Sequence, residues 1–282
     1  CVKSLSSEKK VSPFLVKPEE KDDKENEIKY LYQDLKIGVI MPAYNEEKNI
    51  ARTLSQFPLN ISKNFDIIVI DDGSKDHTIV EAQKYDVIII QHRRNKGNGA
   101  AIQTGLEFLR QNNYDIGVIV DADGQHQPKD INKFIDPIYY GGVDFVIGNR
   151  FEFYYNMSVV KKLLSRAMSV FYTILLQKRV SDPTMVYRAL SKKVIKNLNF
   201  ESEYSITQEM LFKIIPNYTF HEVATKIYER EYGESFISIK TYLKKTIFSV
   251  IKFYLFPKFK KIFNRVLTRF DAVKKVNELM KT

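Results

Sequence analysis

Two carboxylates and one amide fall within five residues of each other, in the pattern Asp121-Ala-Asp123-Gly-Gln125. They follow an apolar run of strand length, and the regular alternation of side chains stops where a strand ends, so both carboxylates can face one cavity. Two hard oxygen ligands together with a bound diphosphate suit Mg²⁺ or Mn²⁺. An isolated Asp-x-Asp is common, however, and is often a pair of solvated turn residues. The pattern needs support from the elements that position it.

Those elements are predicted by five apolar runs, at residues 37–41, 67–70, 87–90, 117–120 and 145–147, which alternate with helical patterns. Such alternation is typical of a largely parallel sheet with crossover helices. Ligands of open α/β sheets lie beyond the carboxyl ends of the strands. The first, second and fourth runs lead into polar residues there, and these are the places where chemistry is expected.

The composition is that of a globular protein, with 282 residues, 44% hydrophobic and 28% charged. The one cysteine, Cys1, excludes a disulfide framework and a zinc site built from cysteines. The longest run without Asp, Glu, Lys or Arg has 11 residues, against the roughly 20 apolar residues that a membrane-spanning helix needs. We therefore expect no spanning helix.

The two ends of the chain differ in charge. Residues 1–30 hold seven basic and seven acidic residues and few large apolar ones, which predicts a disordered extension. Residues 240–282 hold twelve Lys/Arg and two Asp/Glu, an excess equal to the net charge of +10 of the whole chain. Large apolar residues are interleaved with these cations, and Pro257 is expected to divide the region into two helices. A basic amphipathic region of this kind can lie on an anionic membrane, or it can pack on the domain with a solvated lysine face.

Four motifs occur in a fixed order: Pro42-Ala-Tyr-Asn-Glu-Glu, Asp71-Asp-Gly-Ser-Lys-Asp, Asn95-Lys-Gly-Asn-Gly-Ala-Ala and Asp121-Ala-Asp-Gly-Gln-His. This order resembles the inverting family-2 glycosyltransferases, and most closely their dolichol-phosphate mannosyltransferase-like, polyprenyl-phosphate branch. The resemblance covers residues from about 36 to 236. It implies an α/β GT-A fold with a Rossmann-like, mostly parallel sheet flanked by helices. The domains then expected are the extension 1–30, the catalytic domain 31–239 and the basic helical region 240–282.

The resemblance also implies roles for individual residues. Asp121, Asp123 and Gln125 would hold Mg²⁺ or Mn²⁺, and Asp123, Asp182 and Arg150 would be catalytic. His126, next to Gln125, is expected to be a solvated loop residue. The residues implied to bind the nucleotide sugar are Pro42, Tyr44, Glu46, Ile70, Asp72, Asp121, Ala122, Asp123, Gln125, Arg150 and Arg230.

Later segments are similar to those that bind a lipid phosphate in this branch. Gly148-Asn-Arg150 resembles Gly-Ser-Arg, and Lys161 with Ser165 resembles an Arg-Lys-x-x-Ser segment, which implies that Arg150, Lys161 and Ser165 bind the acceptor phosphate. Two departures concern Met185-Val186, where the family has small residues, and Phe236, where it has lysine.

The activity implied is inverting transfer of a sugar from a nucleotide-diphosphate sugar to dolichyl or polyprenyl phosphate, which makes a lipid-linked donor for glycosylation. GDP-mannose, UDP-glucose and UDP-GlcNAc remain open as donors. One alternative is a glycan hydroxyl acceptor, for which Asp182 would be the general base. Another is a membrane-associated protein that binds nucleotide sugars without catalysis. The expected location is peripheral, on the cytoplasmic face of an anionic membrane, with no nucleic-acid partner.

Overall fold

A computed structural model describes residues 3–4, 30–153, 159–203, 205–232 and 246–260, except for the side chains of residues 3–4, 152 and 159–161. The chain divides into two compact units, residues 1–235 and residues 236–282, and each is described by itself. Most of the extension predicted at residues 1–30 lies outside the described residues.

One half of the central sheet is parallel. Its strands are β4 (Ile88–Gln91), β3 (Asn64–Asp71), β2 (Lys36–Ala43) and β5 (Ile116–Ile119), in that order. A two-residue strand, β1 (Lys3–Ser4), pairs antiparallel with β4 at the edge. These strands are rich in buried Ile and Val, as expected for a sheet covered on both faces. The carboxyl ends of β2, β3 and β5 therefore come together at one edge.

The other half of the sheet is mixed. Strand β7 (Arg188–Ser191) lies between β5 and β6 (Phe145–Asn149) and is antiparallel to both, while β8 (Phe220–Ala224) is parallel to β6. The five apolar runs singled out in the sequence all form strands, β2 to β6. Neither β7 nor β8 is indicated by the sequence pattern, because both are short and carry no long apolar run.

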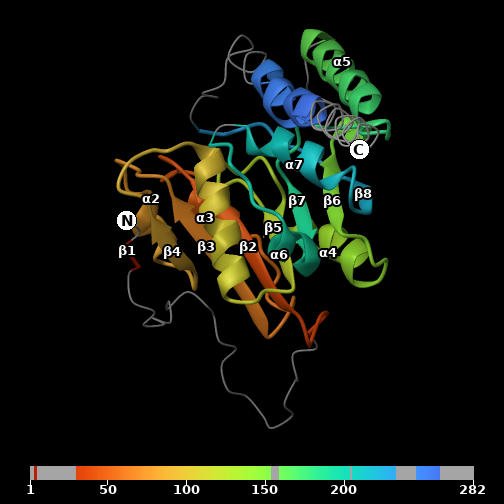
Figure 1. Ribbon diagram of the computed structural model, residues 1–282. Coiled ribbons are helices and arrows are strands. Elements are labelled where there is room, and N and C mark those ends of the chain that lie inside the picture. The colour runs from red at the N-terminus through yellow and green to blue at the C-terminus, as the bar shows by residue number, and fades with distance from the viewer. Residues whose placement is uncertain (1–2, 5–29, 154–158, 204, 233–245, 261–282) are drawn as a thin grey trace, which may run out of the picture. The chain divides into compact units, whose positions relative to one another are not determined.

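Two helices, α3 (Asn98–Gln111) and α6 (Lys192–Asn197), pack on one face of the sheet (Figure 1). A Cβ atom at Gly38 of β2 would collide with Leu109 of α3, and one at Gly105 of α3 would collide with Ile40 of β2. The two glycines thus allow helix and strand to approach closely. The other helices of this unit are α1 (Ile50–Leu54), α2 (Thr78–Ala82), α4 (Asn132–Tyr139), α5 (Val159–Leu176) and α7 (Ile206–Ile214), with short 3-10 turns at Pro128–Asp130 and Phe151–Phe153.

Residues 246–260 of the second unit are helical, with a π-helical stretch at Val250–Leu255. Pro257 does not interrupt the helix within this described segment, contrary to expectation. The wider π-helical turns stand directly before the proline, where the backbone lacks an N–H donor. Exposed apolar residues follow one another at helical spacing along it: Ile247, Phe248, Ile251, Leu255, Phe256 and Phe259. Among the described residues, no helix is long and apolar enough to span a membrane.

Candidate active site

The carboxyl ends of β2 and β3 form the floor of the candidate site. Pro42 and Ile70 face each other in the strand register, and both are buried. Beyond them, two turns are linked reciprocally: the Asn45 N–H donates to Ser74 Oγ (2.9 Å) and the Lys75 N–H donates to Asn45 Oδ1 (2.9 Å). The positive φ of 55° at Asn45 suits a residue type that tolerates left-handed backbone. Tyr44 lies between this turn and the strand, so the predicted nucleotide-binding residues of the first motif are held in one place.

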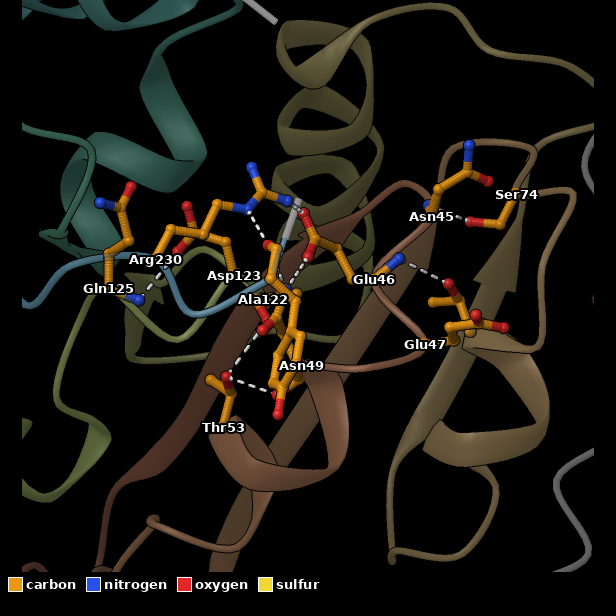
Figure 2. A network of polar contacts seen from close by, with 12 residues as sticks. Asn45, Glu46, Glu47, Asn49, Thr53, Ser74, Ala122, Asp123, Gln125 and Arg230 are labelled. Carbon is orange, nitrogen blue, oxygen red and sulfur yellow. Dashed lines mark hydrogen bonds and ion pairs between the residues drawn. The ribbon is translucent and has the colours of Figure 1, made fainter. Parts of the chain in front are cut away.

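Glu46 is the centre of a polar network (Figure 2). Its side chain is largely buried, and its carboxylate accepts a hydrogen bond from Asn49 Nδ2 (2.7 Å) and forms an ion pair with Arg230. Burial raises the pKa of Glu46, while the hydrogen bond from Asn49 and the charge of Arg230 oppose the rise. Two residues predicted from distant motifs to bind the nucleotide sugar, Glu46 and Arg230, are therefore in direct contact.

The loop after β5 brings its two carboxylates into mutual electrostatic contact. Burial, and then the charge of Asp123, raise the pKa of Asp121 to about 8, although a hydrogen bond from Asn98 lowers it. Asp123 accepts a hydrogen bond from the Gln125 N–H (3.0 Å). The Ala122 carbonyl accepts one from Thr53 Oγ1 (3.1 Å), which fixes the loop to α1.

The donor set at this loop fits a magnesium-like cation. Asp121 and Asp123 lie so near each other that ionising both carboxyl groups is unfavourable. A divalent cation bound between them would offset this repulsion. The Nε2 atom of Gln125 donates a hydrogen bond to the Tyr228 carbonyl (3.2 Å). The other polar atom of this side chain, the amide oxygen, is therefore the one that would coordinate a cation. The described residues contain no cluster of three or more His, Cys, Asp or Glu side chains suited to a metal. Two carboxylates plus substrate phosphates and water are a common set for Mg²⁺.

Asp72, predicted to bind the nucleotide sugar, makes several contacts inside the protein. Its two oxygens accept hydrogen bonds from the Lys96 N–H (2.9 Å) and the Gly97 N–H (2.7 Å), and Oδ1 lies 2.7 Å from His92 Nδ1. Asp72 thus fixes the loop that leads into α3. Asn98, the first residue of that helix, reaches Asp121. Sequence reasoning missed Asn98, because its role depends on two loops meeting in space.

Residues 225–232, which follow β8, run alongside the loop after β5. The Tyr228 N–H donates to the Gln125 carbonyl (3.0 Å), Arg230 Nε donates to the Tyr232 carbonyl (2.8 Å), and Arg52 of α1 pairs with Glu231. This segment therefore places Arg230 beside Glu46. The predicted departure at Phe236 lies outside the described residues.

Arg150 and Asp182, both predicted to be catalytic, form a bidentate ion pair. Arg150 Nε and Nη2 donate to the two oxygens of Asp182 at 2.6 and 3.0 Å, and Nη2 also donates to Thr184 Oγ1 (2.6 Å). Asp182 is almost fully buried. Met185, at the first departure from the family pattern, is buried as well and packs against Gly148.

His126 differs from its expected solvated position. Its side chain is only 5% exposed, its ring lies 5.3 Å from the ring of Tyr187, and its Nδ1 atom is buried without a hydrogen-bond partner among the described residues. Burial lowers the pKa of His126 to about 4. The aromatic neighbour is distant in sequence, and the residue types around His126 gave no signal of its burial.

Two buried charged residues, Arg188 and Glu209, hold backbone in place. Arg188 is completely buried and donates to the carbonyls of Met185 (2.7 Å), Thr207 (2.6 Å) and Pro183 (3.0 Å). Glu209 is also buried and accepts from the N–H groups of residues 201 and 202. Both residues shape loops of the site from inside the protein.

The remaining predicted acceptor residues, Lys161 and Ser165, lie on helix α5. Ser165 is half-buried, and the side chain of Lys161 lies outside the described part of the chain. Helix α5 itself packs through Tyr172 against Phe212 of α7, with ring centroids 5.5 Å apart.

Comparison with known proteins places these motifs in a family. The model of glycosyl transferase family 2 matches residues 38–198. The chain is 37% identical over 187 residues to the UDP-N-acetylglucosamine–dolichyl-phosphate N-acetylglucosaminyltransferase of Methanococcus voltae, covering 59% of this chain and 73% of that protein. It is 32% identical over 192 residues to the dolichol-phosphate mannosyltransferase of Pyrococcus furiosus, covering 64% of this chain and 53% of that protein.

The fold is similar to that of glucosyl-3-phosphoglycerate synthase from Mycobacterium tuberculosis, crystallised with Mn²⁺, UDP and glucosyl-3-phosphoglycerate. The TM-score is 0.62 over 78% of this chain and 80% of that one, with 19% identity. The same synthase has been crystallised with Mg²⁺ and UDP. The expected GT-A fold is therefore confirmed.

Proposed function

Since the chain belongs to glycosyl transferase family 2, we propose that it transfers a sugar from a nucleotide-diphosphate sugar to dolichyl or polyprenyl phosphate with inversion. Relatives with this kind of acceptor align with most of the catalytic unit. The product is a lipid-linked sugar that can act as a donor for glycosylation.

The observation that favours a phosphate acceptor is the ion pair of Arg150 with Asp182. Both carboxylate oxygens of Asp182 accept hydrogen bonds from Arg150, and Oδ1 accepts a further one from Thr184 Oγ1 (3.0 Å). A carboxylate held in this way is poorly placed to take a proton from a sugar hydroxyl. A phosphate monoester is already ionised near pH 7 and needs little help from a base.

The proposed reaction is a single displacement. An oxygen of the lipid phosphate forms a bond to the anomeric carbon, and the bond from that carbon to the nucleoside diphosphate breaks on the opposite side. Pro42, Tyr44, Glu46, Ile70 and Asp72 are proposed to bind or shape the nucleotide end of the donor. Arg150, Lys161 and Ser165 are proposed to bind the acceptor phosphate.

Asp121, Asp123 and Gln125 are proposed to hold Mg²⁺ or Mn²⁺ against the diphosphate, with Arg230 as a nearby cation. A bound divalent cation would stabilise the charge that develops on the leaving diphosphate. This assignment makes the enzyme metal-dependent and is supported by the mutual contact of the two carboxylates.

We further propose that the protein works at the cytoplasmic surface of a membrane, where its lipid acceptor is confined and where anionic headgroups are abundant. Helix α5 supports this with an exposed apolar face. Leu163, Val170 and Ile174 are 69%, 57% and 69% exposed and lie on one side of the helix at positions i, i+7 and i+11. The opposite side, with Tyr172, is buried. The same helix carries Lys161 and Ser165 in its sequence, so docking of α5 on the bilayer would place the segment proposed to bind the acceptor phosphate at the membrane surface.

The test is direct. The purified protein is incubated with a polyprenyl phosphate, Mn²⁺ or Mg²⁺, and GDP-mannose, UDP-glucose or UDP-GlcNAc in turn, and the glycolipid is identified by mass spectrometry. A polyprenyl-phosphate sugar formed from one donor is the expected result. Transfer to a glycan hydroxyl, with none to the lipid phosphate, would contradict the proposal and favour the alternative acceptor. Nucleotide-sugar binding without transfer to either acceptor would favour the non-catalytic alternative.

A further inference from the structure

His126 is a buried polar residue whose contacts inside the protein leave a polar atom unsatisfied. Its Nδ1 is cut off from solvent and has no hydrogen-bond partner among the described residues. Buried polar atoms of native proteins nearly always have a partner, so each exception calls for an explanation. A ligand that enters the site could supply that partner.

The position of the imidazole is fixed from two directions. Along the chain it follows the proposed metal-binding loop, three residues after Asp123. Through space its ring packs on Tyr187, which in turn stacks on Phe134 at 3.7 Å. The Tyr187 carbonyl accepts a hydrogen bond from the Gly148 N–H (3.0 Å), two residues before Arg150.

The imidazole therefore lies where the donor side of the site meets the acceptor side. The charges of Asp123, Arg150 and Asp182 all act on it. The imidazole has two ring nitrogens, and in the neutral ring one donates a hydrogen bond and the other accepts one.

The geometry of an inverting displacement places the sugar in this same region, between the donor side and the acceptor side of the site. The attacking phosphate oxygen and the leaving diphosphate must stand on opposite sides of the anomeric carbon. With the diphosphate at Asp121 and Asp123 and the acceptor phosphate at Arg150, the sugar ring lies between the two groups.

We propose that His126 hydrogen-bonds a hydroxyl group of the transferred sugar and thereby contributes to the choice of sugar. This inference rests on the proposed function. It assigns to His126 a contact with substrate that is separate from the contacts of the metal-binding residues and of the phosphate-binding residues.

The test combines two variants with altered donors. His126→Phe keeps a ring that can pack on Tyr187 but has no nitrogen, and His126→Asn keeps an amide near the place of Nδ1. The donor is whichever of GDP-mannose, UDP-glucose and UDP-GlcNAc the wild-type protein transfers, together with its 3-, 4- and 6-deoxy analogues. His221→Phe, at an exposed position on β8, is the matched control.

The expected result is a loss of kcat/KM of roughly tenfold in His126→Phe with the intact donor. One deoxy donor should show the same loss in the wild type and no further loss in the variant, because the hydroxyl and the imidazole form one interaction. His126→Asn should restore part of the rate, and His221→Phe should behave as the wild type.

Three results would overturn the inference. The first is unchanged kinetics in His126→Phe. The second is an equal loss of kcat/KM in this variant with the intact donor and with every deoxy donor. The third is weaker binding of Mn²⁺ by the variant, which would make His126 a metal ligand. A calorimetric arm compares the Kd of the nucleotide sugar with that of the free nucleoside diphosphate. His126→Phe should weaken binding of the nucleotide sugar and leave binding of the nucleoside diphosphate unchanged. Because binding needs no acceptor, all three nucleotide sugars can be compared in this way even if the wild type transfers no sugar and the proposed function fails.

Discussion

Two carboxylates of the site form ion pairs with arginines from other segments of the chain. Glu46 is paired with Arg230, and Asp182 with Arg150, so the negative charge of each carboxylate is offset by an arginine. Asp121 and Asp123 instead repel each other. That contrast singles out the loop after β5 as the place that gains most from a bound cation.

Replacing Asp123 with Ala should abolish sugar transfer. The variant loses one of the two carboxylates proposed to hold the cation, and even residues that only support metal ligands typically cost 10- to 100-fold, so a loss of more than about 100-fold is expected. Transfer rates and calorimetric binding of UDP or GDP with and without Mn²⁺ would measure it. Asp34→Ala, at an exposed position, is the control. Full activity in excess chelator would be incompatible with the metal assignment.

Asp182→Asn should slow transfer without ending it. The change keeps the shape of the side chain but weakens its hold on Arg150, and hydrogen bonds to charged groups contribute about 1.5 to 3 kcal/mol, so a loss of roughly 10- to 100-fold is expected. The pH dependence of the rate near neutrality should stay the same, because the phosphate nucleophile is already ionised. A near-total loss together with a changed pH profile would instead identify Asp182 as a general base for a hydroxyl acceptor.

The place of a residue in the fold could be predicted from the sequence where a motif sits at a strand end, and could not be predicted where its contacts come from other parts of the chain. The positions of Pro42 and Ile70 follow from neighbouring parallel strands. The burial of His126 depends on Tyr187, which is 61 residues further along. Nothing in the local pattern separates a buried histidine from a solvated one, so that expectation was wrong.

At the scale of elements, the mixed half of the sheet depends on one carboxylate at the start of β6. Asp144 accepts hydrogen bonds from Lys193 Nζ (3.1 Å), Thr219 Oγ1 (3.1 Å) and the Thr219 N–H (3.3 Å), and its carbonyl accepts from the Ser191 N–H (2.9 Å). It thus joins β6 to the end of β7, to α6 and to the residue before β8. Although burial opposes ionisation, the hydrogen bonds from Lys193 and Thr219 hold the pKa of Asp144 below its usual value.

Asp144→Asn should therefore destabilise the protein in a pH-dependent way. A carboxyl group with a lowered folded pKa stabilises above its unfolded pKa of about 3.9, and that contribution is lost as the pH falls through the folded value. We expect a loss of about 1.5 to 3 kcal/mol in the free energy of unfolding at pH 7. Urea titrations at pH 7 and near pH 3 would measure it, with exposed Asp86→Asn as the control. A loss of the same size at both pH values would show that the charge of Asp144 contributes nothing.

The order of strands in this half could not be predicted from the sequence. Strand β7 enters the sheet between β5 and β6 and runs against both, and its four residues contain one buried arginine. Arg188 is accommodated by carbonyls of the loop before the strand and of the residue Thr207. Such compensation exists only in the folded chain. The parallel strands β2 to β5, by contrast, are continuous apolar runs that the sequence displays directly.

For the whole molecule, each of the two units has an exposed surface that the proposed association with a membrane would use. In the first unit it is the apolar face of α5, with Leu163, Val170 and Ile174. In the second it is the helical segment 246–260, where exposed apolar residues accompany Lys252, Lys258 and Lys260. The two surfaces differ in chemistry, because the face of α5 would act through burial of apolar groups and the lysines would act through attraction to anionic headgroups.

That difference predicts how binding to vesicles responds to salt. Each lysine near an anionic surface contributes about 1 kcal/mol, within a Debye length of roughly 8 Å at physiological ionic strength. Full-length protein with Lys252, Lys258 and Lys260 changed to Gln should bind anionic vesicles more weakly at low salt and equally at high salt. Protein with Leu163, Val170 and Ile174 changed to Gln should bind more weakly at both salt concentrations, because burial of apolar groups is not screened.

Sedimentation with vesicles of neutral and anionic lipid would measure both effects. In both variants, sugar transfer to a short, water-dispersed polyprenyl phosphate should fall less than transfer to a long one. Wild-type binding by both variants would show that these surfaces pack against protein and that the enzyme meets its lipid acceptor by other means.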